Sequence, residues 1–196
     1  MIGDKGAIRR DLRARRHRVS AAEVATAAAA VAERLFAFSP YLRARTLVAY
    51  VATEHEIPID EIVADAWRSG RAVLLPHQGI RGFAPWRQGE SLAEGPWGIF
   101  EPCTERCVWP TPPALVLVPL VAWDSTGTRL GRGAGFYDRA LATVDPGVTR
   151  VGVAYEFQEY RGLPRDTWDV PVHYVITERR VVTCTAPEAV RLAAGV

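Results

Sequence analysis

The stretch RLGRGAGFYDR, residues 129–139, decides the fold of this chain. Glycine occupies every second position from Gly131 to Gly135, with arginines on the N-terminal side and an aspartate near the end. The apolar run ALVLVPLVA precedes it at 114–122, and FYDRALATV follows at 136–144 with helical spacing of its apolar residues. The glycines therefore predict a tight connection between a buried strand and the start of a helix.

Strands and helices alternate on both sides of this connection. Apolar runs rich in β-formers predict strands at 46–52, 72–76, 114–122, 150–155, 172–177 and 180–185. Apolar periodicity predicts a helix at 4–18 with Ile8 and Leu12 on its inner side, and further helices at 20–39, 60–70 and 136–144. Ser20 and Glu23 predict a capping box, and Asp60 is expected to cap the third helix. The region 77–113 stays unordered at this stage, with a short strand at 82–86 and a loop at 98–102.

This alternation indicates an α/β fold of three layers, with a mainly parallel central sheet and helices on both faces. Ligands of such sheets bind beyond the carboxyl ends of the strands. The chain has 196 residues, of which 48% are hydrophobic and 23% charged, and these proportions fit one domain spanning 1–196.

Charge and cysteine content exclude several classes of function. A net charge of +2 is too small to indicate nucleic-acid binding, but it suits a small anionic ligand. Cys103, Cys107 and Cys184 lack disulfide or zinc-site spacing, which favours a reducing compartment. No apolar run approaches the ~18 residues of a membrane span, and no apolar signal core follows the N-terminus. We expect a cytoplasmic monomer with no membrane or nucleic-acid partner.

The alternating glycines match neither the G-x-G-x-x-G spacing of dinucleotide-binding turns nor the G-x-x-x-x-G-K-[ST] spacing of P-loops. Residues without a Cβ still let an anion approach main-chain amides at a helix N-terminus. Arg129 and Arg132 would add charge-assisted hydrogen bonds. The alternative is a tight turn carrying two solvated arginines, and the residues alone leave both interpretations open.

Asp138 lies in the first turn of the helix that follows the glycines. A carboxylate at this position could hold Mg²⁺ against phosphate oxygens, because Mg²⁺ prefers hard oxygen ligands. The same carboxylate could simply complement the helix dipole. Both roles remain possible from the sequence.

Together with the preceding VPLVAWD, the glycine stretch resembles the signature of the 5-formyltetrahydrofolate cyclo-ligase family. Four further segments are similar to family motifs and occur in the same order: KGAIR at 5–9, YVATEHE at 50–56, GIFEP at 98–102 and DVPVHYVITE at 169–178. The central motif is specific, whereas each of the other four is weak alone. The family's fold is similar to that of sugar-phosphate isomerases and CoA transferases.

The resemblance implies an enzyme, an ATP- and Mg²⁺-dependent ligase that converts 5-formyltetrahydrofolate to 5,10-methenyltetrahydrofolate and releases ADP and phosphate. It implies catalytic roles for Arg132 and Tyr137, substrate binding by Val51 and Glu56, and Mg²⁺ binding by Asp138 and Asp169. The ATP-binding residues that it implies are Lys5, Arg9, Arg129, Leu130, Gly131, Arg132, Gly133, Ala134, Gly135, Phe136 and Tyr137.

Less specific interpretations accompany these residues. Lys5 and Arg9 could lie on a solvated helix face, Glu56 in a solvated loop, and Asp169 could only cap the turn before Pro171. The chain departs from the family pattern at Leu120, Trp123, Ala134 and Phe136, which leaves a paralogue with another substrate as an alternative.

Two further functions compete with the ligase. One is an ATP-independent isomerase or CoA transferase on the same fold, using Glu56 or Glu101 as its carboxylate. The other is an RNA-binding module that uses the arginines at 9–18.

Overall fold

The protein is described here by a computed structural model, which covers residues 4–185. A seven-stranded sheet forms its centre, in the order β11-β10-β9-β6-β1-β2-β3. Five strands run parallel: β1 (Thr46–Val48), β2 (Ala72–His77), β6 (Ala114–Pro119), β9 (Thr149–Val153) and β10 (Tyr174–Ile176). The edge strands β3 (Gly82–Pro85) and β11 (Val181–Thr183) are antiparallel to their neighbours. The predicted α/β class with a mainly parallel sheet is confirmed.

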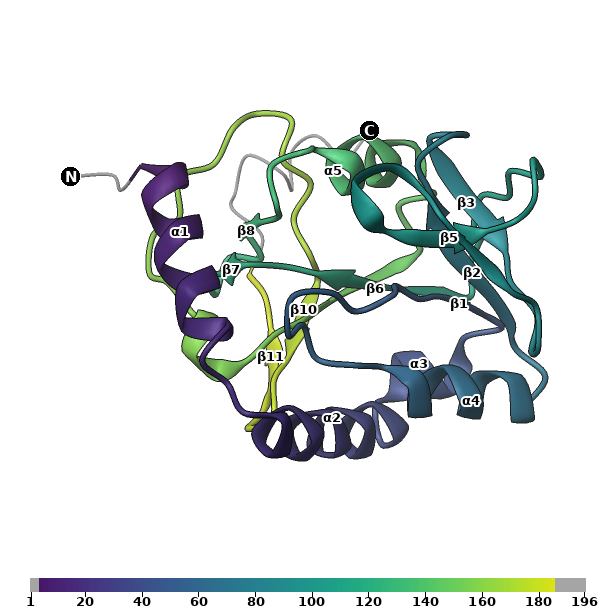
Figure 1. Ribbon diagram of the computed structural model, residues 1–196, viewed down its shortest axis with the longest axis horizontal. Helices are drawn as coiled ribbons and strands as arrows, with labels where there is room; N and C mark the ends of the chain where they lie inside the picture. Colours follow the sequence, from purple (N-terminus) through teal and green to yellow (C-terminus); the bar gives the residue numbers. More distant parts are fainter. Residues whose placement is uncertain (1–3, 186–196) are drawn as a thin grey trace.

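Helices cover both faces of this sheet, as Figure 1 shows. One face carries α2 (Ala21–Phe36), α3 (Ser39–Arg43) and α4 (Asp60–Arg68), and the other carries α5 (Phe136–Thr143). Each interface has its own apolar core: Val31, Leu35 and Ile62 pack against the first face, and Ala140 and Leu141 against the second. The residues of both cores are almost fully buried, and burial on two faces explains why the central strands read as continuous apolar runs.

The helix α1 (Lys5–Arg16) packs at the side of the sheet, on the small hairpin of β7 (Ala122–Trp123) and β8 (Arg129–Leu130). Ile8 and Leu12 contact Leu130 there, as their spacing predicted. Because this apolar stripe packs on the hairpin, it sets the rotation of α1 and therefore which of its basic residues face the protein. The remaining elements are the hairpin of β4 (Leu92–Glu94) and β5 (Phe100–Pro102), and the 3₁₀ turns η1 (Pro96–Gly98) and η2 (Glu156–Gln158).

Several strands are shorter than predicted, and two of the predicted runs leave the sheet part-way. The run 114–122 is not one strand, because β6 ends at Pro119 and the chain then turns outward to form β7, where Val121 N donates to Leu130 O. The run 46–52 is strand only over its first three residues, and Tyr50 and Val51 lie beyond it. Both runs stay apolar because their second halves line buried space rather than continue the sheet.

Local signals at the helix starts had mixed outcomes. The capping box of Ser20 and Glu23 is present. Asp60 does not cap α4: Ile59 is the N-cap residue, without a side-chain cap, and Asp60 is the first helical residue. Its carboxylate still lies in the first turn, where it complements the helix dipole. The segment 98–102, predicted as a loop, contributes β5, because pairing with β4 satisfies its main chain.

Candidate functional site

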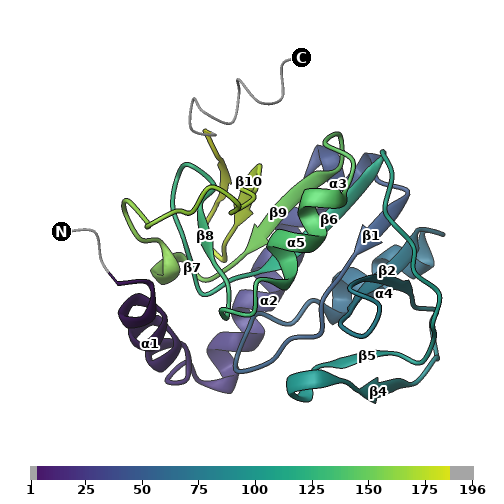
Figure 2. The ribbon, with the colours of Figure 1, turned by 90° about the horizontal axis from the view of Figure 1, so that it is seen from above.

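A cavity of about 380 Å³ opens beyond the carboxyl ends of the parallel strands. Pro119 at the end of β6 lines it, together with residues of α1 and of β5. In the view of Figure 2, α1 and the β4–β5 hairpin lie at opposite edges of the fold. Residues 129–138 form one side, here named the loop wall, and residues 50–56 form the other, named the strand wall. This is the place where a parallel α/β sheet usually binds its ligand.

The loop wall leaves its main chain bare. A Cβ at Gly131 would meet no atom within 4 Å, and one at Gly133 would meet only Arg9 Cζ at 4.0 Å. Gly133 and Gly135 have φ angles of +108° and +66°, which glycine adopts without strain. Gly135 is the N-cap of α5 and provides no side-chain cap, so the first amides of this helix lack that partner. An anion could approach these amides from the cavity.

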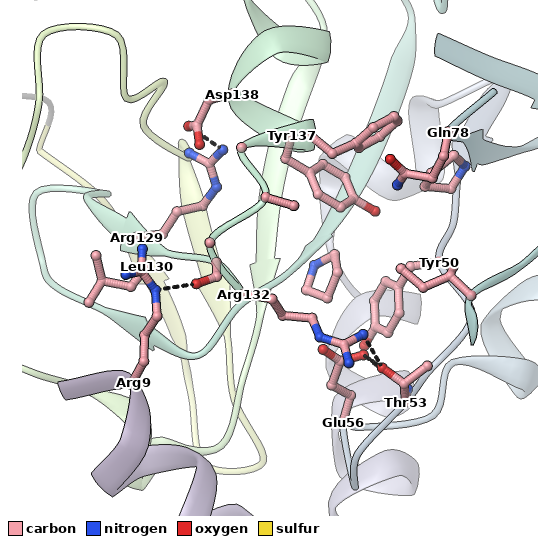
Figure 3. Close-up of a pocket in the computed structure, with 18 of the residues that line it drawn as sticks. Arg9, Tyr50, Thr53, Glu56, Gln78, Arg129, Leu130, Arg132, Tyr137 and Asp138 are labelled. Atoms are coloured by element: carbon pink, nitrogen blue, oxygen red, sulfur yellow. Dashed lines mark hydrogen bonds and ion pairs between the residues drawn. The ribbon is translucent and has the colours of Figure 1, made fainter. Parts of the chain in front are cut away.

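Four cationic side chains line the cavity around this bare loop: Lys5, Arg9, Arg129 and Arg132. Figure 3 labels the three arginines. Arg9 Nε donates to Gly131 O at 2.8 Å. Lys5 Nζ lies 2.7 Å from Asp166 Oδ2 and 2.9 Å from Asp169 Oδ2. Burial opposes the charge on Lys5, but the hydrogen bonds to these two carboxylates raise the pKa of the ammonium above its ordinary value. The sequence-predicted pair Lys5 and Arg9 therefore does reach one cavity.

The other two cations come from the loop wall itself. Arg129 is almost fully buried, and its Nη2 lies 2.7 Å from Asp138 Oδ1. Arg132 is one-third exposed and reaches across the cavity, where it donates to Thr53 Oγ1 at 2.8 Å and to Glu54 Oε1 at 2.7 Å. Arg132 thus joins the two walls of the cavity.

Both predicted metal ligands line the cavity, and each is partly engaged. Asp138 uses Oδ1 to accept from Arg129 and from Val170 N, at 2.7 and 3.2 Å. Asp169 uses Oδ2 to accept from Lys5 and from Asp166 N, the latter at 2.8 Å, so it also caps its own turn. Between residues 4 and 185 no group of three or more His, Cys, Asp or Glu side chains could hold a metal. A site here would need oxygens from a bound phosphate and from water, which is the coordination that Mg²⁺ favours.

The strand wall is more deeply buried. Glu56 is 7% exposed and its Oε2 accepts from Thr53 N at 3.0 Å. Arg16 Nη1 lies 3.7 Å from Glu56 Oε1. Burial raises the pKa of the Glu56 carboxyl above its ordinary value, although the charge of Arg16 opposes that change. Val51 lines the same cavity, so both predicted substrate-binding residues border one space.

Among the described residues that line the cavity, Tyr137 is the one whose buried side-chain polar atom has no hydrogen-bond partner. Its hydroxyl is buried and has no hydrogen-bond partner in residues 4–185. Burial, with the charge of Glu56 adding to it, raises the pKa of this phenol far above its ordinary value. Figure 3 shows the ring entering the cavity from the loop wall toward Tyr50. A buried hydroxyl that stays protonated is a hydrogen-bond donor in need of an acceptor.

The comparisons with known proteins agree with this geometry. The sequence model of the 5-formyltetrahydrofolate cyclo-ligase family matches residues 1–178. The chain belongs to this family. It is 34% identical to 5-formyltetrahydrofolate cyclo-ligase of Escherichia coli K12 over 158 residues. The aligned region covers 76% of this chain and 87% of that protein. The Haemophilus influenzae cyclo-ligase is 29% identical over 177 residues, covering 86% of this chain and 95% of the relative.

Solved structures of the family have the same fold. The NMR structure of Aquifex aeolicus 5,10-methenyltetrahydrofolate synthetase aligns with a TM-score of 0.79 and 29% identity, covering 94% of each chain. The Mycoplasma pneumoniae 5,10-methenyltetrahydrofolate synthetase aligns with a TM-score of 0.70 and 22% identity, covering 90% of this chain and 99% of that one. This second likeness concerns the fold alone.

Every residue that the sequence assigned to the site lines the one cavity. Sequence reasoning missed a charged network behind the strand wall, in which Glu54 accepts from Arg13, Arg16 and Arg132. The signal was present, because basic residues at 5, 9, 13 and 16 follow one face of α1. It also missed Asp166, which shares Lys5 with Asp169.

The positions of a few residues bear on the two competing functions. Of the two carboxylates considered for an ATP-independent isomerase or CoA transferase, Glu56 lines the cavity. Glu101 does not line the cavity: its Oε2 accepts from Gln78 N at 2.7 Å and lies 3.6 Å from His77 Nδ1. Of the arginines at 9–18, Arg16 is 1% exposed and is not available to nucleic acid, whereas Arg10, Arg15 and Arg18 are exposed. No helix between residues 4 and 185 has the length and hydropathy needed to cross a membrane.

Proposed function

We propose that this chain is a 5-formyltetrahydrofolate cyclo-ligase that uses ATP and Mg²⁺ to form 5,10-methenyltetrahydrofolate, ADP and phosphate. The observation that supports it best is the convergence of five separate family motifs on one cavity with two unlike walls. One wall is cationic with bare amides, as a polyphosphate requires, and the other offers a buried carboxylate to a neutral heterocycle.

ATP is assigned to the loop wall. Its phosphates would accept hydrogen bonds from the amides around Gly131 to Gly135, and the guanidinium groups of Arg9 and Arg129 would offset their charge. Lys5 would turn from its carboxylate partners toward the same phosphates. Mg²⁺, held by Asp138 and Asp169, would neutralise charge between the outer phosphates. The free oxygen of each carboxylate suits that role, since their hydrogen bonds use only Oδ1 and Oδ2 respectively.

The folate is assigned to the strand wall. Glu56 would accept hydrogen bonds from N–H groups of the pterin, and Val51 would contact its ring face. A carboxylate that is already buried and oriented by Thr53 N loses little on binding. Its raised pKa marks the cost of holding this charge without a ligand, which donors on the pterin would offset.

The chemistry between the two walls is a phosphoryl transfer followed by ring closure. The formyl oxygen attacks the γ-phosphorus, ADP departs, N10 attacks the formyl carbon with loss of its proton, and the C–O bond breaks to release phosphate. Such a reaction asks for positioning and charge stabilisation rather than a protein nucleophile. Arg132, which spans the walls, would stabilise charge on the transferring group, and the orphan hydroxyl of Tyr137 would donate to an oxygen there.

The test is direct. Protein mixed with MgATP and 5-formyltetrahydrofolate should generate the near-UV absorbance of the methenyl product, and EDTA should stop it. Growth of that absorbance without ATP, or none with folded protein and both substrates, would contradict the proposal. Uptake of MgATP by calorimetry together with no folate turnover would instead identify a paralogue with another substrate.

A further inference from the structure

A second cavity, of about 610 Å³, adjoins the main one. The two share Asp166, Trp168 and Asp169, so this segment of the chain lines both. The other walls of the second cavity come from the end of α5 and the turn that follows it, from the start of β9, and from the segment after Asp169. Of the residues assigned above to ATP, folate or Mg²⁺, Asp169 is the one that reaches this second space.

Two arginines line this cavity with donors that nothing satisfies. The Nε atoms of Arg150 and Arg165 are buried and have no hydrogen-bond partner in the described chain. A buried donor without an acceptor costs about 1–3 kcal/mol, and more when it is charged. Four buried side-chain atoms in residues 4–185 lack a hydrogen-bond partner. Besides the two arginine Nε atoms, one of the four is Tyr137 Oη, which belongs to the main cavity. Orphan donors therefore gather where the two cavities are.

Arg150 also meets a further donor. Arg150 N donates to His173 Nδ1 at 3.1 Å, while Arg150 Nη2 lies 2.6 Å from His173 Nε2. A neutral imidazole carries one proton, on either Nδ1 or Nε2. If Nδ1 carries it, that N–H faces the N–H of the Arg150 main chain; if Nε2 carries it, that N–H faces the Nη2 group of Arg150. Burial and the charge of Arg150 lower the pKa of His173 to about 4, which keeps the ring neutral at pH 7. Among the described residues, the surroundings of Arg150 therefore hold more hydrogen-bond donors than acceptors.

The charges around the cavity are also unbalanced. Asp166 and Asp169 are its carboxylates, and both bind Lys5. No carboxylate within residues 4–185 forms an ion pair with Arg150 or with Arg165. In the same part of the chain, the guanidinium of Arg165 donates one hydrogen bond, from Nη2 to the main-chain oxygen of Asp169. The nearby Arg129 adds positive charge and is itself paired with Asp138. Water could fill the space but would not supply the missing negative charge.

We propose that the second cavity binds a small oxyanion, a phosphate or carboxylate group, between the guanidinium groups of Arg150 and Arg165. Guanidinium groups match the oxygens of either anion in a two-donor geometry. The cavity exceeds the volume of a single ion, and the apolar side chains of Leu141, Val144 and Pro146 give it room for a small organic group attached to the anion. This site is separate from the proposed function, whose anions are assigned to the main cavity.

Calorimetry on the full chain, without nucleotide, folate or metal, tests the proposal with two probes, inorganic phosphate and glutarate, at constant ionic strength. We expect a dissociation constant on the order of 1 mM, equivalent to about −4 kcal/mol. Arg150→Gln and Arg165→Gln should each weaken binding at least about tenfold, whereas Arg132→Gln in the main cavity and the exposed Arg87→Gln should not. Binding that follows Arg132 instead would place the anion in the main cavity and overturn the proposal, as would no binding of either probe.

A second measurement needs no variant to fold. In ¹H–¹⁵N spectra of the wild-type arginine side chains, the Nε–H signals of Arg150 and Arg165 should shift on titration, while that of Arg87 stays fixed. A shift with phosphate alone or with glutarate alone identifies the anion, and shifts with both identify a general oxyanion site. Unmoved signals under saturating probe would overturn the proposal. Because neither measurement uses ATP or folate, failure here leaves the ligase assignment intact, and the reverse also holds.

Discussion

The two walls of the main cavity are built in opposite ways. The loop wall exposes main chain at Gly131 and Gly133 and leaves the Tyr137 hydroxyl without a partner. In the strand wall, Glu56 already accepts from Thr53 and lies near the buried Arg16. The unused donors of the loop wall need a ligand to accept their hydrogen bonds, whereas the polar groups of the strand wall already have partners within the protein. Substitutions in the loop wall should therefore change activity, and those in the strand wall should change stability as well.

The largest effect is expected from Asp138→Asn. The amide keeps an oxygen for Arg129 and Val170 N, so the fold should survive, but it removes the negative charge proposed to hold Mg²⁺. We expect kcat to fall about 10³-fold, since a bound metal stabilises charge by several kcal/mol. Asp166→Asn is the matched control, because Asp166 also borders the cavity and binds Lys5 but is not a proposed metal ligand. Equal losses in both variants would contradict the metal role.

Arg132→Ala tests whether the contact between the walls is catalytic. Removing a charge that acts in the transition state should lower kcat by about 10²–10³. Arg13 also lies against Glu54 Oε1, at 2.6 Å, but it does not line the cavity. Arg13→Ala should therefore leave kcat nearly unchanged. A loss below tenfold in Arg132→Ala would mean that this arginine only ties the walls together.

Glu56→Gln should separate the two substrates. A hydrogen bond to a charged group contributes about 1.5–3 kcal/mol, so KM for 5-formyltetrahydrofolate should rise about ten- to hundredfold. KM for ATP should not change, because Glu56 lies on the strand wall. Steady-state kinetics with each substrate varied in turn would measure both. A rise in KM for ATP alone would reverse the assignment of the walls.

Two glycine substitutions should separate ATP binding from stability: one should change only KM for ATP and the other only the free energy of unfolding. Gly131 is not in the positive-φ region and a Cβ there meets no protein atom, so Gly131→Ala should keep its stability but raise KM for ATP about tenfold. Gly162, with a φ of +69° and equally open surroundings, lies outside the cavity. Gly162→Ala should lose about 1 kcal/mol of stability and keep its KM. Thermal unfolding and kinetics on both variants would show whether bare backbone at Gly131 serves the ligand.

The smallest effect is a pH dependence of stability in the strand wall. The folded-state pKa of Glu56 is raised, mainly by burial, so its contribution to stability is present below the unfolded pKa and is lost as pH rises through the folded pKa. Gln imitates the protonated form. Urea unfolding should thus show Glu56→Gln gaining on the wild type as pH rises from about 4 to 7. A constant difference, or one of opposite sign, would mean that Arg16 outweighs burial.

The sequence predicted the order of the elements well where local chemistry decided it. The capping box at Ser20 and the apolar stripe of Ile8 and Leu12 depend on residues within one or two turns. It failed where apolar residues had two possible partners. Leu120 and Val121 are as apolar as the strand before them, yet they leave the sheet after Pro119 and pack beside η2 and the β7–β8 hairpin.

The candidate site divides in the same way. The glycine spacing, the basic residue types and the motif order were sufficient to name most of the charged residues of the main cavity, because a family signature records which side chains meet without stating how. The partners of those side chains were not predictable. That Arg132 spans to Thr53, and that Glu54 gathers three arginines, depends on how α1 docks against a hairpin more than a hundred residues away.

The sequence by itself determined the α/β class, the position of the bare loop and the identity of the charged groups, since these depend on periodicity and residue type. Only the tertiary structure decided which charges are paired and which donors are left over. Pairing depends on distances between segments that are remote in the chain, and the second cavity illustrates this. Arg150 and Arg165 belong to no motif of the sequence, and they become a candidate site because folding buries the Nε atom of each and, within residues 4–185, leaves both of these atoms without an acceptor.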